Sequence, residues 1–108
     1  MILEVAILDV VLGQEAAFEQ SFRQAQKIIE NMSGYQGHEL QRCLETPSRY
    51  LLLVRWDTLE DHTVGFRQSA EYQIWKKLLH HYYDPFPEVE HYTLSFRRNN
   101  EDSPSSAD

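Results

Sequence analysis

The N-terminal segment, residues 2–12, is apolar on both faces of the strand that it predicts. Its β-branched and aliphatic composition and the closing Gly13 are typical of a strand. Alternate positions of a strand point to opposite sides of a sheet, and both sets are apolar here except at Glu4 and Asp9. Residues 49–56 repeat this pattern. A sheet made from such strands needs an apolar layer against each of its faces.

Two segments have the periodicity of amphipathic helices. In residues 14–32 one apolar stripe contains Phe18, Phe22, Ala25, Ile29 and Met32. A second helix is predicted in two pieces, because Thr58 and Asp61 resemble a capping box and Ser69 can cap a new start. The apolar stripe of the second piece contains Tyr72, Trp75, Leu79 and Tyr82. Pro85 ends this helix.

The order of the predicted elements indicates the fold. Residues 35–45 predict a more polar edge strand, and residues 89–96 predict the last strand. Strand, helix, strand, strand, broken helix, strand is the ferredoxin-like α+β arrangement, βαββαβ, with a four-stranded antiparallel sheet and helices on one face. A second copy of the sheet would cover the other face, so a homodimer is predicted. We expect one domain at residues 1–97 and a disordered C-terminal tail at residues 98–108.

Composition excludes several kinds of partner. The formal net charge of −7 argues against nucleic acid and against an anionic membrane surface. Cys43 is the only cysteine, which excludes an internal disulfide and a thiolate metal cluster and favours a cytoplasmic location. The first residues lack the basic region and cleavage site of a signal peptide. No segment approaches the roughly 20 apolar residues that span a bilayer.

A set of local features lies between Trp56 and Tyr92. A strand ends in Trp56, a polar turn follows, the next helix breaks at Ser69, Trp75 lies on the helix face, and the last strand opens Pro-x-Val-x-His-Tyr. In these features the chain resembles the antibiotic biosynthesis monooxygenase family of dimeric ferredoxin-like α/β barrels. The resemblance covers residues 1–96. It implies a homodimer that uses dioxygen on a small aromatic or quinol-like molecule, with no bound cofactor.

One branch of that family degrades haem, and the sequence departs from it. The haem-degrading branch uses an Asn on the first strand and a Trp and a His on the second helix. The corresponding helix positions hold Phe66 and Lys76 here, and residues 2–12 contain no Asn. Other similar members oxidise aromatic phenols, anthrones or quinols, or process small ketones.

An oxygenase without flavin or metal must hold its substrate as an electron-rich phenolate or enolate. Such a site needs a base of near-neutral pKa, a donor for the developing oxyanion and a dry apolar pocket. His62 on the short helix and His91 on the last strand are the candidates for base or hydrogen-bond donor. Phe66, Tyr72 and Trp75 are the candidates for the substrate-binding wall, between the helices and the sheet.

These residues also have purely structural interpretations. The two histidines could be a solvated surface residue and a half-buried strand residue, and the three aromatic residues could be core. Arg55 could hold an anionic substrate, although a pairing with Glu4 or Asp9, across the sheet or across the dimer interface, is favoured. No metal site is expected at His80 and His81, since adjacent helical residues diverge by about 100°.

Two other functions stay open at this point. A small-metabolite isomerase or ketone-processing enzyme would use the same base without consuming oxygen. A non-catalytic dimeric ligand-binding module would need the histidines only for structure.

Overall fold

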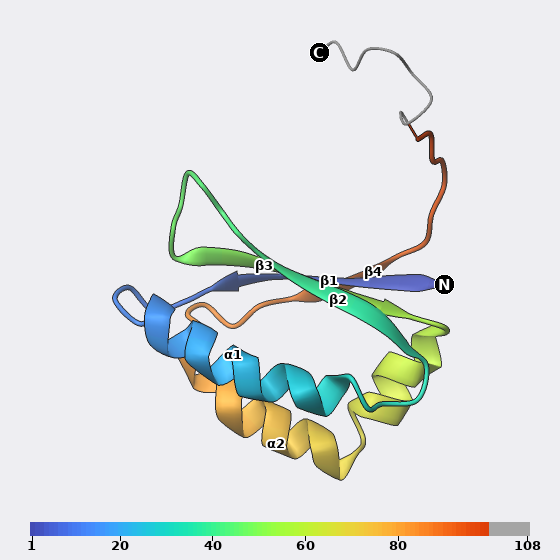
Figure 1. Ribbon diagram of the computed structural model, residues 1–108, viewed down its shortest axis with the longest axis horizontal. Helices are drawn as coiled ribbons and strands as arrows, with labels where there is room; N and C mark the ends of the chain where they lie inside the picture. Colours follow the sequence, from blue (N-terminus) through green and yellow to red (C-terminus); the bar gives the residue numbers. More distant parts are fainter. Residues whose placement is uncertain (100–108) are drawn as a thin grey trace.

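The computed structural model describes residues 1–99 and shows the predicted ferredoxin-like fold (Figure 1). The elements in order are β1 (Ile2–Asp9), α1 (Glu15–Ile29), β2 (Tyr35–Arg42), β3 (Arg49–Trp56), the π-helical segment η1 (Asp61–Phe66), α2 (Ala70–Leu79), the short 3-10 turn η2 (His80–Tyr82) and β4 (Val89–Tyr92). The disorder predicted for the tail lies, for residues 100–108, outside the described residues. No helix within residues 1–99 has the length and apolar character required to cross a membrane.

The four strands form one antiparallel sheet in the order β2-β3-β1-β4. The two strands predicted to be apolar on both faces, β1 and β3, are therefore the central pair, and the polar β2 is an edge strand as predicted. Helices α1 and α2 lie against one face of the sheet, and the opposite face is uncovered (Figure 1). Even-numbered positions of β1 and β3 point toward the helices, and odd-numbered positions point to the open face.

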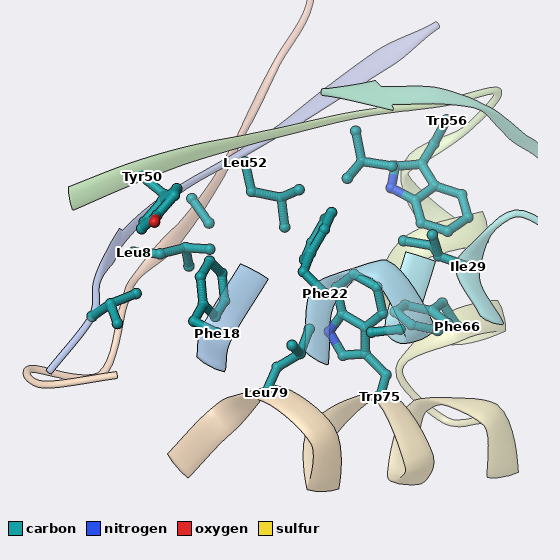
Figure 2. Close-up of a cluster of buried hydrophobic side chains, with 14 residues drawn as sticks. Leu8, Phe18, Phe22, Ile29, Tyr50, Leu52, Trp56, Phe66, Trp75 and Leu79 are labelled. Atoms are coloured by element: carbon teal, nitrogen blue, oxygen red, sulfur yellow. The ribbon is translucent and has the colours of Figure 1, made fainter. Parts of the chain in front are cut away.

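The hydrophobic core fills the space between the sheet and the two helices (Figure 2). The predicted stripe of α1 is buried at Phe18, Phe22, Ala25 and Ile29. Trp75 and Leu79 bring the buried face of α2 into the same cluster, and the Phe22 and Trp75 rings meet edge to face with centroids 5.9 Å apart. Spacing in the sequence thus predicted the layer of side chains that packs on the sheet.

Several strands and helices are shorter than predicted. The strand predicted at residues 2–12 ends at Asp9, and only an isolated bridge pairs Val10 with Tyr83. The strand predicted at residues 89–96 ends at Tyr92 because its neighbour β1 begins nearby: Tyr92 lies opposite Leu3. The helix predicted at residues 14–32 and the strand predicted at 35–45 also end about three residues early.

The break in the second helix follows the predicted capping residues. The Asp61 carboxylate accepts from the backbone N–H and the hydroxyl of Thr58, and the hydroxyl of Thr58 accepts from the N–H of Asp61. The Ser69 hydroxyl caps α2 by accepting from the N–H of Tyr72 at 3.0 Å. Gly34 has φ +83°, and a Cβ at this position would overlap the carboxyl group of Asp61. Glycine therefore allows η1 to approach the start of β2.

Candidate active site

A cavity of about 330 Å³ lies between the sheet and the helical layer. Its walls come from the helix-facing side of β1 and β3, from η1 and α2, and from the segment that leads into β4. Most of the lining is aromatic or aliphatic. The ionisable groups that line it are Glu4, His62, Arg67, Tyr72, His80 and Tyr83. A cavity of this kind, apolar with a few convergent polar groups, is suited to a small organic ligand.

Glu4 places a carboxyl group inside this apolar layer. The residue is only 6% exposed, and it points toward the helices with Ala6 and Leu8. Its Oε1 atom accepts a hydrogen bond from the indole N–H of Trp56 at 2.9 Å and also lies 3.3 Å from Nε2 of His62. The other oxygen, Oε2, has no hydrogen-bond partner within residues 1–99 and is not fully enclosed. Glu4 lines the cavity, and Oε2 is the oxygen of its carboxyl group that is free to bind a ligand.

Burial changes the acidity of this carboxyl group. Loss of solvent raises the pKa of Glu4 from 4.5 to about 7, although the Trp56 hydrogen bond and the Arg67 guanidinium both favour the ionised form. Near neutral pH the group is therefore divided between its acid and its carboxylate. A carboxyl group with such a pKa can accept a proton and return it under the same conditions.

His62 lies under the sheet beside Glu4. Its ring is 3% exposed and stacks on Trp56 with centroids 5.5 Å apart and planes inclined by 20°. Desolvation, with smaller contributions from Arg67 and His91, lowers the pKa of His62 to about 3. The imidazole is thus neutral at physiological pH, with one nitrogen protonated and the other bare. A neutral imidazole of such low pKa is a weak base but a competent hydrogen-bond donor.

His91 contacts His62 but does not line the cavity. Nδ1 of His62 and Nε2 of His91 form a hydrogen bond of 2.8 Å. His91 lies on β4 directly opposite Glu4 of β1, and burial and Arg67 lower the pKa of its imidazole. The lining of the cavity includes His62 and omits His91. The structure therefore brings the two predicted histidines together. His62 lines the cavity, and His91 contacts His62 from outside it.

The three predicted aromatic residues all line the cavity. Phe66 meets Tyr72 and Trp75 edge to face, with centroids 5.2 and 5.6 Å apart. Phe66 and Trp75 also belong to the buried core, so the structural interpretation of these two residues holds as well (Figure 2). The cavity wall is a continuation of the core, which gives it a fixed shape.

The predicted pairing of Arg55 with Glu4 or Asp9 across the sheet of one chain is wrong, and the alternative pairing across a dimer interface stays a prediction. Arg55 has the opposite parity from Glu4 and lies on the open face, 3.8 Å from Glu39. Asp9 instead pairs with Arg49 at 2.8 Å. Within the described residues no group of three or more His, Cys, Asp or Glu side chains is arranged to hold a metal ion.

Comparison with known proteins establishes the family. The model for antibiotic biosynthesis monooxygenases matches residues 1–78, which is well over half of the chain. The chain belongs to the antibiotic biosynthesis monooxygenase family. A related protein, the uncharacterized protein YczJ of Bacillus subtilis, is 56% identical over 92 residues, which are 85% of this chain and 97% of YczJ.

Solved structures of other proteins share the fold. The crystal structure of a family protein from Bordetella bronchiseptica is 39% identical, with a TM-score of 0.84, and the match covers 88% of this chain and 97% of the other. SnoaB from Streptomyces nogalater, a cofactor-independent oxygenase, is 17% identical with a TM-score of 0.68, over 91% of this chain and 94% of SnoaB. At that identity SnoaB supports the fold alone.

Glu4 is an ionisable cavity residue of this family member for which the sequence predicted no part in the site. It stood out as an exception in an apolar strand and as a possible partner of Arg55, but no role in the cavity was predicted for it. The signal was its parity, because an acid that alternates with Ala6 and Leu8 must face the same buried layer. Its contacts with Trp56 and His62 depend on strand register and on the helical geometry of η1, which spacing does not specify.

Proposed function

We propose that the chain is a cofactor-independent monooxygenase that uses dioxygen on a small aromatic or quinol-like molecule. One observation carries the proposal: a buried carboxyl group of near-neutral pKa lines an aromatic cavity, with one oxygen hydrogen-bonded to Trp56 and the other without a partner in the described residues. Family membership and the shared fold of a cofactor-independent oxygenase support it. The substrate binds against Phe66, Tyr72 and Trp75.

In this reaction Glu4 acts as the base. Its carboxylate takes a proton from the substrate through Oε2, which leaves an electron-rich phenolate or enolate. The substrate carbon then forms a bond to dioxygen, and the resulting peroxide anion takes the proton back from Glu4. Loss of water leaves a carbonyl group, so the carbon has lost two hydrogens and gained one oxygen atom while the second oxygen atom departs as water. The substrate supplies all the electrons.

His62 supports the base. Its Nε2 faces the oxygen of Glu4 that does not meet the substrate, so a proton on Nε2 stabilises the carboxylate. Of the two roles predicted for this histidine, base and hydrogen-bond donor, its low pKa favours the donor. The apolar walls exclude water from the reactive phenolate and from the peroxide.

A homodimer formed through the open face of the sheet belongs to the same proposal. The apolar side chains that this face presents are Leu3, Val5, Ile7, Leu51 and Leu53. Ile7 is 51% exposed, although it lies in the central strand β1. A second copy supplies a matching apolar layer, as the resemblance to dimeric α/β barrels implies.

Oxygen consumption by the purified protein, with no added cofactor, tests the enzymatic proposal. The panel contains anthrones, naphthoquinols and flavonoid-like phenols. Glu4→Gln keeps the shape of the side chain but cannot accept a proton, so we expect uptake to fall by about 100-fold or more. Glu88→Gln, an exposed carboxyl on the approach to β4, is the matched control and should retain full uptake.

Other outcomes separate the alternatives. Conversion of a panel compound without oxygen uptake, lost in Glu4→Gln, would identify an isomerase that uses the same base. Ligand binding without conversion, equal in the wild type and in Glu4→Gln, would identify a binding module. Either result would exclude the oxygenase for that compound.

A further inference from the structure

A line of polar contacts leads from Glu4 through His62, which also lines the cavity, to His91, which does not. Oε1 of Glu4 lies 3.3 Å from Nε2 of His62, and Nδ1 of His62 is hydrogen-bonded to Nε2 of His91 at 2.8 Å. The three residues come from β1, η1 and β4, which meet only in the folded chain. The His62 ring makes a hydrogen bond through Nδ1 and a close ionic contact through Nε2, so it lies between the other two side chains.

The positions of the protons follow from these contacts. When Glu4 is ionised, its negative charge favours a hydrogen on the His62 nitrogen 3.3 Å away, so we expect His62 to be protonated on Nε2. Because this imidazole is neutral, its Nδ1 is bare and accepts the hydrogen bond. His91 must then donate from Nε2, which leaves Nδ1 of His91 bare.

The outer end of this line is open. Nδ1 of His91 has no hydrogen-bond partner within the described residues, and it is not fully enclosed, since no buried side-chain nitrogen or oxygen there lacks a partner. His91 is half-buried and does not line the cavity. Its free nitrogen is therefore accessible from a side of the molecule other than the ligand cavity.

We infer that His91 and His62 form a proton relay between solvent and the carboxyl group of Glu4. A proton bound at Nδ1 of His91 releases the proton on Nε2 to Nδ1 of His62, and His62 passes its Nε2 proton to Oε1 of Glu4. One proton enters, and both imidazoles end neutral with their tautomers reversed. The reverse sequence returns the proton to solvent. His91 is thus a positioning and relay residue, and the purpose of the relay rests on the proposed role of Glu4 as base.

The relay explains how the carboxyl group can equilibrate while the cavity is filled. A bound substrate would cover Oε2, and His62 is stacked beneath Trp56 and hardly exposed. The other ionisable groups that interact electrostatically with Glu4 are Arg67, Tyr72 and Tyr83. Within the described residues no side-chain hydrogen bond joins any of them to Glu4, His62 or His91, so none provides a second route.

Nitrogen NMR of the protein labelled with ¹⁵N-histidine tests the inference without any substrate. Above the pKa of Glu4, we expect both His62 and His91 to be neutral and protonated on Nε2. The second quantity is the rate at which the Nε2 proton of His62 exchanges with water. His91→Gln keeps an N–H donor toward His62 but cannot pass a proton, so it should slow this exchange on the order of 100-fold. His91→Phe retains a ring but has no nitrogen to pass a proton, so it should slow the exchange by a similar factor.

Two controls complete the design. His80→Gln changes a histidine of the cavity wall and should leave the exchange rate unchanged. The Nε2 tautomer of His62 in His91→Gln reports that the site is intact. Equal exchange rates in wild type and His91→Gln, or the opposite tautomer in either ring, would overturn the relay. Slowed exchange in a protein that never consumes oxygen would retain the relay and reject the oxygenase.

Discussion

The indole nitrogen of Trp56 donates to Oε1 of Glu4 at 2.9 Å, although the two residues are 52 positions apart in the sequence. Strand register creates this contact, because Glu4 lies opposite Val54 and Trp56 follows two residues later on the same face of β3. The largest fully buried side chain of the core thus holds the ionisable group of the cavity. This hydrogen bond therefore joins a core residue to the proposed catalytic base.

Removing that hydrogen bond should make Glu4 less acidic. In Trp56→Phe the carboxylate loses a donor that stabilises its charge, so we expect the pKa of Glu4 to rise further above 7 by about one pH unit. Titration of ¹³C-labelled glutamate carboxyl groups measures the change. Trp75→Phe is the control, since Trp75 lines the same cavity without a hydrogen bond to Glu4. An unchanged or lower pKa in Trp56→Phe would contradict the role assigned to the indole.

The activity should depend on pH in a way that follows this carboxyl group. The proposed base is the ionised form, so oxygen uptake should rise as pH increases through about 7, the pKa of Glu4. Trp56→Phe should move this rise to higher pH, in step with the NMR titration. A profile that falls with increasing pH, or one whose midpoint stays fixed in Trp56→Phe, would assign the base to another group.

Glu4 and His62 should have opposite effects on stability as a function of pH. Folding raises the pKa of Glu4 from 4.5 to about 7, so its contribution to stability falls as pH rises between these values. Folding lowers the pKa of His62 from 6.5 to about 3, so its contribution rises with pH over that interval. Between 4.5 and 6.5 the pair binds one proton in both states: on His62 when unfolded, on Glu4 when folded. The two slopes therefore cancel.

Single substitutions should reveal the pH dependence of stability that each of the two residues contributes. In Glu4→Gln the free energy of unfolding should rise with pH between about 4.5 and 6.5, by up to about 1.4 kcal/mol per pH unit. In His62→Gln it should fall over the same interval by a similar amount. Urea unfolding at a series of pH values measures both, relative to the wild type at the same pH. Parallel curves for all three proteins would mean that folding does not move a proton between these groups.

The open face of the sheet should control assembly. Leu53→Lys places a charge among the apolar side chains of that face, and we expect it to weaken the homodimer by at least about tenfold in dissociation constant. Ile74→Lys is the matched control, because Ile74 is exposed on α2, on the helical side. Light scattering across a dilution series measures both. A monomeric wild type, or equal effects of the two substitutions, would reject this interface.

The sequence predicted the layers better than the contacts within them. Alternation and helical spacing were sufficient for the ferredoxin-like order, because burial imposes those periods on each element separately. The meeting of His62 with His91 was not predictable in this way, since it joins two elements 29 positions apart and depends on the π-helical geometry of η1. Glu4 was visible as an anomaly, but its partners became known only with the register of β1 against β3 and β4.

Strand β1 has no face that is free to vary. Its even positions supply Glu4 and the cavity floor, and its odd positions supply apolar side chains to the open face. Inserting or deleting one residue in this strand would exchange the two sets, moving the carboxyl group outward and Leu3 or Val5 inward. Length changes in β1 should therefore be far less tolerated than length changes in the loops, and a library of single-residue insertions would show β1 as a continuous intolerant block.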